Sequence, residues 1–287
     1  MGVLKGNNHL ISFGLATCDM GVKGLHSCIE GKLPQREHTM TLSALAIQGG
    51  PSATVVVDGM ALIRRLYTQD LDWVSGGQYL ELWNNVRDFV GAFRRQGLRL
   101  VLFFDGGVDE AKLIEWASRR RDDQKKCQRV SRCLENGEPA PKQAWMPPPN
   151  ISKHVGGAFR DVGCQVYFTA GEADREMAQY CIAQRCVAVL GKDSDFFVLP
   201  VRPAGSSPGG AMVATHTLSS RPRPSEPPLR SRYWQVPCYL VLDSLQLRAD
   251  PPTVTAYTRP SVEAALELPS PLWPLLGSLV GNDFVQA

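Results

Sequence analysis

Short apolar runs that stop at an acidic residue recur along this chain, and they constrain its fold more than any other feature. The segment ATVVVDG, residues 53–59, is a β-branched run that ends at Asp58, and LRLVLFFDGG, residues 98–107, ends in the same way at Asp105. Between them, residues 78–97 carry apolar side chains at helical spacing. This order of strand, helix and strand predicts a pair of parallel strands.

The same alternation continues along the chain. Residues 151–163 and 172–185 have helical patterns, residues 164–169 and 186–190 read as strands, and ordered structure is expected to return at residues 238–247. Continuously apolar strands that alternate with helices are typical of a parallel sheet covered on both faces. The sequence therefore predicts an α/β protein with three layers, in which a central, mainly parallel sheet lies between two layers of helices.

Acidic residues stand at the ends of these apolar segments or just beyond them. Ligands of parallel α/β sheets bind outside the carboxyl ends of the strands, where these acids would converge. Each acid taken singly is better explained as a helix cap or a turn residue. Together they would need cations, or raised pKa values, to be tolerated at one edge. The residues are Asp58, Asp105, Glu172, Asp174, Asp193, Asp195 and Asp283.

Carboxylate oxygens without histidine or cysteine partners suit hard cations, so the acids predict Mg²⁺ or Mn²⁺. Two such ions, about 3.5–4 Å apart, would activate a water for phosphodiester hydrolysis. In the motif GKDSDFFVL, Asp193 and Asp195 would hold metal together, and a local turn is the alternative reading of the same motif. The eight cysteines lack zinc-finger spacing with suitable histidines.

A basic helix is expected over residues 109–134, directly after Asp105. Lys112 and Arg119 are seven residues apart and therefore share one face. Such a helix beside an acidic pocket suits nucleic-acid binding, because phosphate contacts supply most of the affinity. The alternative is a solvated helix whose own acids offset its charge, and the formal net charge of the chain is only +3. The basic residues singled out are Lys112, Arg119, Arg120, Arg121, Lys125 and Lys126.

Three tryptophans, Trp73, Trp83 and Trp116, lie in or near these helical segments. Tryptophan can stack on nucleic-acid bases. Aromatic residues at helical spacing belong more often to the core, and we expect these three to pack there.

Six motifs occur in the order MGVKGL, VVVDG, FFDGG, GEAD, GKDSDFFVL and GNDF. In this order they resemble the signatures of the flap endonuclease and XPG-like 5′ nuclease superfamily. Within it, the chain is most similar to the asteroid branch and the related constitutive coactivators of peroxisome proliferator-activated receptor gamma. The resemblance covers residues 20–200 and returns at 276–284, and it implies a PIN-like α/β core with an arch-like basic helical region.

The resemblance also implies roles for individual residues. The seven acids would be the metal ligands, although Asp174 stands where flap endonucleases usually have Glu. Lys112 and Arg119 would contact the scissile phosphate as catalytic residues. Gly21 matches the glycine that follows the initiating methionine in the family, and it would contact nucleic acid together with the basic helix.

The resemblance suggests a division of the chain. Residues 1–19 form an extension ahead of the family's natural start, residues 20–200 a PIN-like nuclease domain, and residues 233–287 the remainder of that domain, ending before a C-terminal region. Residues 201–232 are rich in Pro, Ser and Arg, so we expect a disordered loop that could contact protein partners.

The leading functional hypothesis is a metal-dependent endonuclease for branched or single-stranded DNA, with RNA left open as a substrate. The alternative is a scaffold that keeps the fold and acts as a nuclear coactivator or an RNA-binding protein. A hydrolase or receiver-like domain with one Mg²⁺ would leave the basic helix unexplained. No run of about 18 apolar residues could span a membrane, and no secretory signal is evident, so a nuclear or cytoplasmic location is expected.

Overall fold

The computed structural model describes residues 25–108, 110–197, 236–273 and 275–276. The predictions for residues 1–19, for Gly21, for the loop at 201–232 and for Asp283 lie outside these described residues. No helix within the described ranges is long and apolar enough to cross a membrane.

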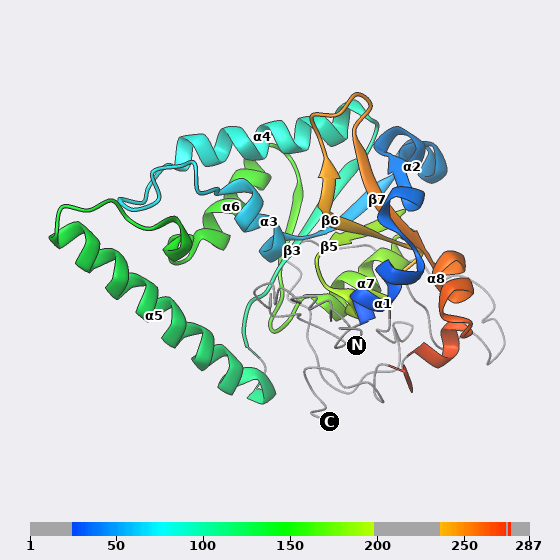
Figure 1. Ribbon diagram of the computed structural model, residues 1–287. Helices are drawn as coiled ribbons and strands as arrows, with labels where there is room; N and C mark the ends of the chain where they lie inside the picture. The colour runs from blue at the N-terminus through cyan, green and yellow to red at the C-terminus, as the bar shows by residue number, and fades with distance from the viewer. Residues whose placement is uncertain (1–24, 109, 198–235, 274, 277–287) are drawn as a thin grey trace, which may run out of the picture.

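Within the described residues, seven strands form one sheet in the order β1-β7-β6-β5-β2-β3-β4 (Figure 1). The strands β6, β5, β2, β3 and β4 run parallel, which confirms the predicted mainly parallel sheet. At one edge β7 pairs antiparallel with β6, and β1 pairs antiparallel with β7. Neither β7 nor β1 was predicted from the sequence. The bounds are β1 (Thr39–Thr41), β2 (Thr54–Asp58), β3 (Arg99–Phe104), β4 (Gln165–Phe168), β5 (Ala188–Gly191), β6 (Cys238–Gln246) and β7 (Thr253–Thr258).

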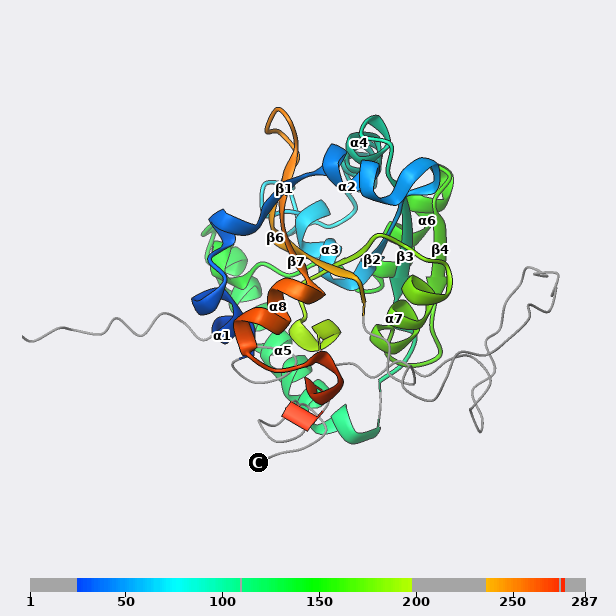
Figure 2. The same ribbon diagram turned by 90° about the vertical axis from the view of Figure 1, so that its right-hand side faces the viewer.

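Helices cover both faces of the sheet, as the turned view in Figure 2 shows. Neighbouring residues of β2 point in opposite directions: Val55 and Val57 pack into one hydrophobic cluster, and Val56 packs into the other. The first cluster is completed by α2 (Leu42–Gly49), α3 (Gly59–Leu66), α4 (Tyr79–Arg95) and α6 (Ile151–Asp161). The second is completed by α1 (Leu25–Lys32), α7 (Asp174–Ala183) and α8 (Arg259–Leu266). The predicted three-layer α/β architecture is therefore confirmed.

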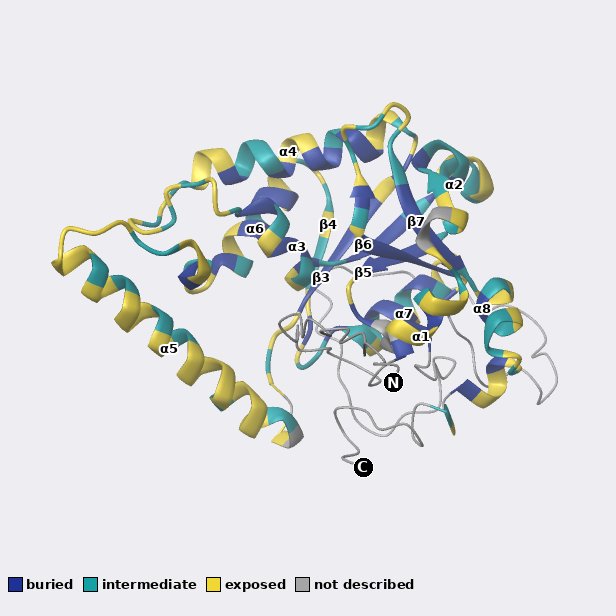
Figure 3. Ribbon diagram, viewed as in Figure 1, coloured by how far each residue is buried: buried dark blue, intermediate teal, exposed yellow. Residues whose placement is uncertain are grey.

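The basic helix α5 (Leu113–Glu135) stands away from the sheet and contains no buried residue (Figure 3). It begins later than predicted, because residues Glu110–Lys112 form a 3₁₀ turn instead. Trp116, expected in the core, is 47% exposed on this helix, and its ring lies 5.9 Å from the guanidinium carbon of Arg120. The core expectation for Trp116 was wrong, since a helix that leaves the body offers its side chains no core to enter.

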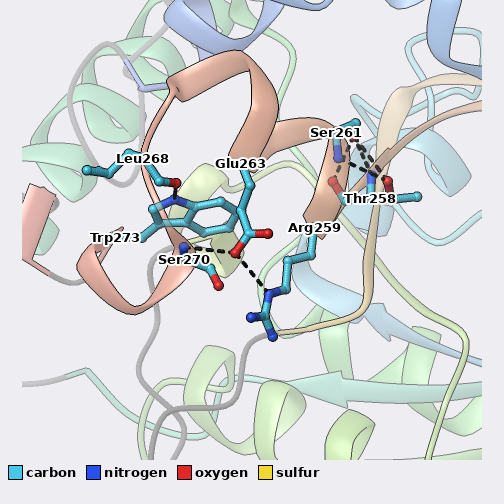
Figure 4. Close-up of polar contacts among 7 residues, drawn as sticks. All are labelled: Thr258, Arg259, Ser261, Glu263, Leu268, Ser270 and Trp273. Carbon is cyan, nitrogen blue, oxygen red and sulfur yellow. Dashed lines mark hydrogen bonds and ion pairs between the residues drawn. The ribbon is translucent and has the colours of Figure 1, made fainter. Parts of the chain in front are cut away.

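Polar contacts fix the helix α8 and the segment that follows it (Figure 4). Thr258 caps the helix in a reciprocal capping box with Ser261. Glu263 accepts hydrogen bonds from the side chain of Arg259 at 3.4 Å and from the backbone N–H of Ser270 at 2.9 Å. The indole of Trp273 donates to the carbonyl of Leu268 at 2.9 Å while its ring is buried. These contacts hold Val262 of α8 and the ring of Trp273 in the second hydrophobic cluster.

Glycines follow the acids at the ends of two neighbouring strands, and both are in close contact. A Cβ at Gly59 would lie 2.5 Å from the ring of Phe104. A Cβ at Gly106 would lie 1.6 Å from the carbonyl oxygen of Thr169, which is backbone and cannot swing away. Any side chain at Gly106 must therefore displace the turn that leads out of β3.

Gly106→Ala should lower the free energy of unfolding by about 2 kcal/mol or more, because overpacked backbone has to move. The matched control is Gly157→Ala in α6, where an added Cβ meets nothing within 4 Å. That change should raise stability by roughly 0.5–1 kcal/mol through helix propensity. Urea unfolding of the two variants measures both effects, and equal behaviour would contradict the close contact at Gly106.

Candidate functional site

The carboxyl ends of β2, β3 and β5 meet at one edge of the sheet. Asp58 is the last residue of β2 and lies in register with Phe103, two residues before Asp105. On the other side, Val57 pairs with Leu190 of β5, which places Gly191 beside Asp58. A Cβ at Gly191 would lie 3.6 Å from that of Asp58. The parallel register therefore brings acids from separate segments to a common edge, as predicted.

Asp58 acts as a helix cap and as a member of the acidic edge at the same time. Its carboxylate accepts a hydrogen bond from the backbone N–H of Ala61 at 3.0 Å, which caps α3. Burial raises the pKa of Asp58 to about 6, and the charge of Asp105 raises it further, whereas the Ala61 bond and Lys192 oppose the rise. The helix-cap reading of this residue is thus confirmed, and its carboxylate also feels the charge of Asp105.

Asp105 joins β3 to the beginning of α7. Its Oδ1 accepts a hydrogen bond from the backbone N–H of Ala173 at 2.8 Å. Asp105 stays accessible to solvent, yet the surrounding protein desolvates its carboxyl group enough to raise the pKa. The charge of Glu172 also raises this pKa, while Ala173 and Lys112 act in the opposite direction. Asp105 therefore lies within electrostatic reach of both Asp58 and Glu172.

Lys112 connects the basic helix to this edge. Its ammonium contacts both carboxylate oxygens of Glu172, at 2.9 Å and 3.0 Å, and the two side chains are only 17% and 28% exposed. The predicted phosphate contact at Lys112 thus lies among the predicted acids.

Arg119 has a different neighbour. It pairs with Glu115, one turn earlier on α5, and both side chains are largely exposed. Three other basic residues of α5 also meet acids of the same helix: Arg120 and Lys126 pair with Asp123, and Lys125 pairs with Asp122. Arg121 is exposed. These pairs match the alternative reading of a solvated helix that offsets its own charge.

The remaining acids are described to different extents. Asp174 is the first residue of α7, and Asp193 is buried with 9% of its surface exposed. The charges of both act on the phenol of Tyr239, as does that of Asp58. Asp195 lies in the 3₁₀ turn Ser194–Phe197, but its side chain is outside the described structure.

The donor chemistry of this edge fits a hard cation, although the side chains do not form a closed cage. All the acids offer carboxylate oxygens, and mutual repulsion contributes to the raised pKa values of Asp58 and Asp105. Among the described residues, however, no group of three or more His, Cys, Asp and Glu side chains is close enough to hold a metal ion. The predicted seven-ligand set is therefore not assembled in the described part of the chain, and two bound ions remain a prediction.

Two residues of this edge were missed from the sequence. Lys192 forms an ion pair with Asp243 at 2.7 Å and lowers the pKa of Asp58. Its place inside the motif GKDSD was the available signal. Tyr239 belongs to the continuously buried, apolar first part of β6, and this run gives no hint of a polar neighbour.

No family model matches the chain. Constitutive coactivators of peroxisome proliferator-activated receptor gamma from Bos taurus and Homo sapiens are each 30% identical to it over 190 residues, or 64% of this chain. The chain is a distant homologue of these coactivators. It spans about a quarter of their length: 27% of the bovine protein and 21% of the human one.

Solved nuclease structures share the fold of this chain. Human GEN1 in complex with Holliday junction DNA superimposes with a TM-score of 0.50 and 14% identity, covering 93% of this chain and 51% of GEN1. The catalytic core of Rad2 with a DNA substrate gives a TM-score of 0.51 and 13% identity, covering 93% and 62% of the two chains. At this identity the likeness establishes the α/β nuclease-core fold and not the activity.

The raised pKa of Asp58 predicts a specific pH dependence of stability. The folded state keeps the proton up to about pH 6, whereas the unfolded chain releases it near about pH 4. The free energy of unfolding therefore falls as the pH rises through this window. Asp58→Asn keeps a capping oxygen without the charge, so it should raise stability by roughly 1–3 kcal/mol at pH 7 and have little effect below pH ~4.

Urea unfolding between pH 3.5 and 8 measures the difference between the two proteins. An Asp88→Asn variant is the control, because Asp88 is exposed on α4 and pairs only with Arg87 at 3.6 Å. A gain for Asp58→Asn that does not change with pH would show that repulsion and burial of the charge are not its cause.

Proposed function

We propose that the chain is a metal-dependent nuclease that hydrolyses phosphodiester bonds of branched or single-stranded DNA, with RNA as a further candidate. The observation that carries this proposal is that Asp58, Asp105 and Glu172 lie together at one edge of the sheet. Lys112, in the turn that leads into the basic helix α5, forms an ion pair with Glu172 at this edge. Acidic residues alone would suit a site that binds a cation without a phosphate. The ammonium group of Lys112, in the turn that precedes the basic helix, adds a contact for a phosphate.

The chain's own residues have defined roles in this proposal. Asp58 and Asp105 each have one carboxylate oriented by a backbone N–H, from Ala61 and Ala173 respectively, so their oxygens are fixed at the edge. Mg²⁺ or Mn²⁺, two ions in the full proposal, would supply an activated water and neutralise charge on the phosphate. Further proposed ligands are Glu172, Asp174, Asp193, Asp195 and Asp283.

Lys112 would exchange its partner when a substrate arrives. In the free protein its ammonium neutralises Glu172. A phosphate oxygen at the edge would draw the ammonium away, while a cation would take over the neutralisation of the carboxylate. Arg119, Arg120, Arg121, Lys125 and Lys126 would contact the nucleic-acid backbone by leaving their pairs within α5. These exposed pairs are weak, so the exchange costs little.

A scaffold function is the second candidate, and two observations favour it. Relatives that are 30% identical to this chain are named as coactivators, and the described acids do not enclose a metal position. A chain of this kind would act in the nucleus as a coactivator or bind RNA through the same basic helix. The nuclease and the scaffold differ in whether the acids turn over a substrate.

Cleavage of a labelled DNA panel, with branched and single-stranded members, distinguishes the two functions. With Mg²⁺ or Mn²⁺ we expect cleavage that EDTA abolishes. Asp105→Asn and Asp193→Asn should each reduce it by about 10²-fold or more, because each removes a charge that stabilises the transition state. Asp88→Asn is the matched control and should cleave normally. Normal folding of the wild-type protein without any metal-dependent cleavage would contradict the nuclease and favour the scaffold.

Lys112→Ala should lower kcat by about 10²-fold with little change in KM, because a contact made mainly to the reacting phosphate acts in the transition state. The control is Lys125→Ala, which removes an exposed ammonium bonded to Asp122 on the same helix. Lys125→Ala should leave kcat unchanged and alter only the salt dependence of KM. If both substitutions act only on KM, Lys112 is a general phosphate contact and its proposed catalytic role is wrong.

A further inference from the structure

A tyrosine hydroxyl lies buried beneath the acidic edge without a hydrogen-bond partner. Tyr239 on β6 is 1% exposed, and its hydroxyl contacts no donor or acceptor within the described residues. A buried polar group left unpaired costs free energy, and such groups are rare in folded proteins. The unpaired hydroxyl would be explained if it gains a hydrogen-bond partner when a ligand binds at the acidic edge.

The ring of Tyr239 is held firmly in place. It stacks on Phe196 with 5.9 Å between ring centroids and meets Phe197 edge-on at 5.0 Å. Gly191 lies between this ring and Asp58: a Cβ there would lie 3.3 Å from the ring of Phe196, 3.6 Å from the Cβ of Asp58 and 3.8 Å from the ring of Tyr239. The phenol is thus fixed next to the strand end that carries Asp58.

The acids of the edge surround this phenol electrostatically. Burial raises the pKa of Tyr239 well above its usual range, and the charges of Asp193, Asp58, Asp243 and Asp174 raise it further, in that order. An ordinary phenol is protonated at neutral pH, so the hydroxyl of Tyr239 has a hydrogen that it can donate to a carboxylate. Asp193 is the acid whose charge it feels most, and Asp193 is itself buried.

We propose that Tyr239 is a positioning residue of the acidic edge, whose hydroxyl donates a hydrogen bond to the Asp193 carboxylate when a divalent cation is bound there. This inference rests on the proposed cation site. A carboxylate that binds a metal through one oxygen is commonly oriented by a hydrogen bond to the other. Tyr239 can supply such a donor from the neighbouring strand. In the register of β5 and β6 it lies opposite Val189, and β5 ends two residues before Asp193.

The chain offers a matched control for a buried tyrosine hydroxyl. Tyr67 is also fully buried and also has no partner for its hydroxyl among the described residues. It belongs to the other hydrophobic cluster, where the charge of Asp72 reaches it instead of the acids of the edge. Tyr239→Phe and Tyr67→Phe therefore remove the same group from two different surroundings.

The test is titration of the full chain with Mn²⁺, followed by electron paramagnetic resonance and by the thermal unfolding temperature. Tyr239→Phe should weaken Mn²⁺ binding by roughly 10- to 100-fold, the usual effect of removing a hydrogen-bond partner of a metal ligand, and should reduce the Mn²⁺-induced rise in Tm. Tyr67→Phe should bind Mn²⁺ like the wild type. Without Mn²⁺, both variants should unfold at or above the wild-type temperature, since each loses an unpaired buried group.

The outcomes separate this inference from the proposed function. Wild-type affinity in Tyr239→Phe would overturn the inference and leave the cation site standing, and so would equal weakening in both variants. Failure of the wild type to bind Mn²⁺ would overturn both. Selective weakening in Tyr239→Phe, in a wild-type protein that binds Mn²⁺ but cleaves no DNA, would support the inference and contradict the nuclease.

Discussion

The parallel register of β5, β2 and β3 is the constraint on which the site depends. Strands in this arrangement begin at one edge and end at the other, so the residues after each strand must share one narrow region. Here those residues include Asp58, Asp105 and Asp193, and the charge of Asp105 repels that of Asp58. The fold tolerates the repulsion through hydrogen bonds from backbone N–H groups, raised carboxyl pKa values, and two lysines, Lys112 and Lys192.

The same edge of the sheet also contacts the turn from which the basic helix α5 begins. The helix α5 has no buried residue, so little hydrophobic burial holds it. The half-buried pair between Lys112 and Glu172 is therefore a joint between α5 and the sheet, as well as a contact within the site. Any ligand that competes for Lys112 or Glu172 changes the tie between them. In the proposed function, a ligand bound at this edge would therefore also act on the attachment of α5 through this pair.

The sequence predicted the parallel strands and the converging acids because both follow from local patterns: continuous apolar runs and the residues that end them. It did not predict β7 and β1, which pair antiparallel at the edge of the sheet and depend on a partner strand instead of a helical crossover. Trp116 was misplaced because its environment depends on where α5 leaves the body. Tyr239 could not be found, since three of the four acids that act on it, Asp193, Asp58 and Asp174, come from segments distant in sequence.

Crystals of the full chain grown with Mn²⁺, measured at a wavelength where manganese scatters anomalously, test the central claim most directly. The account predicts anomalous density at the carboxyl ends of β2, β3 and β5, at about 2.0–2.2 Å from carboxylate oxygens that include Asp58 or Asp105. Well-ordered density for these side chains without an anomalous peak, or a peak only elsewhere on the molecule, would contradict a cation site at this edge.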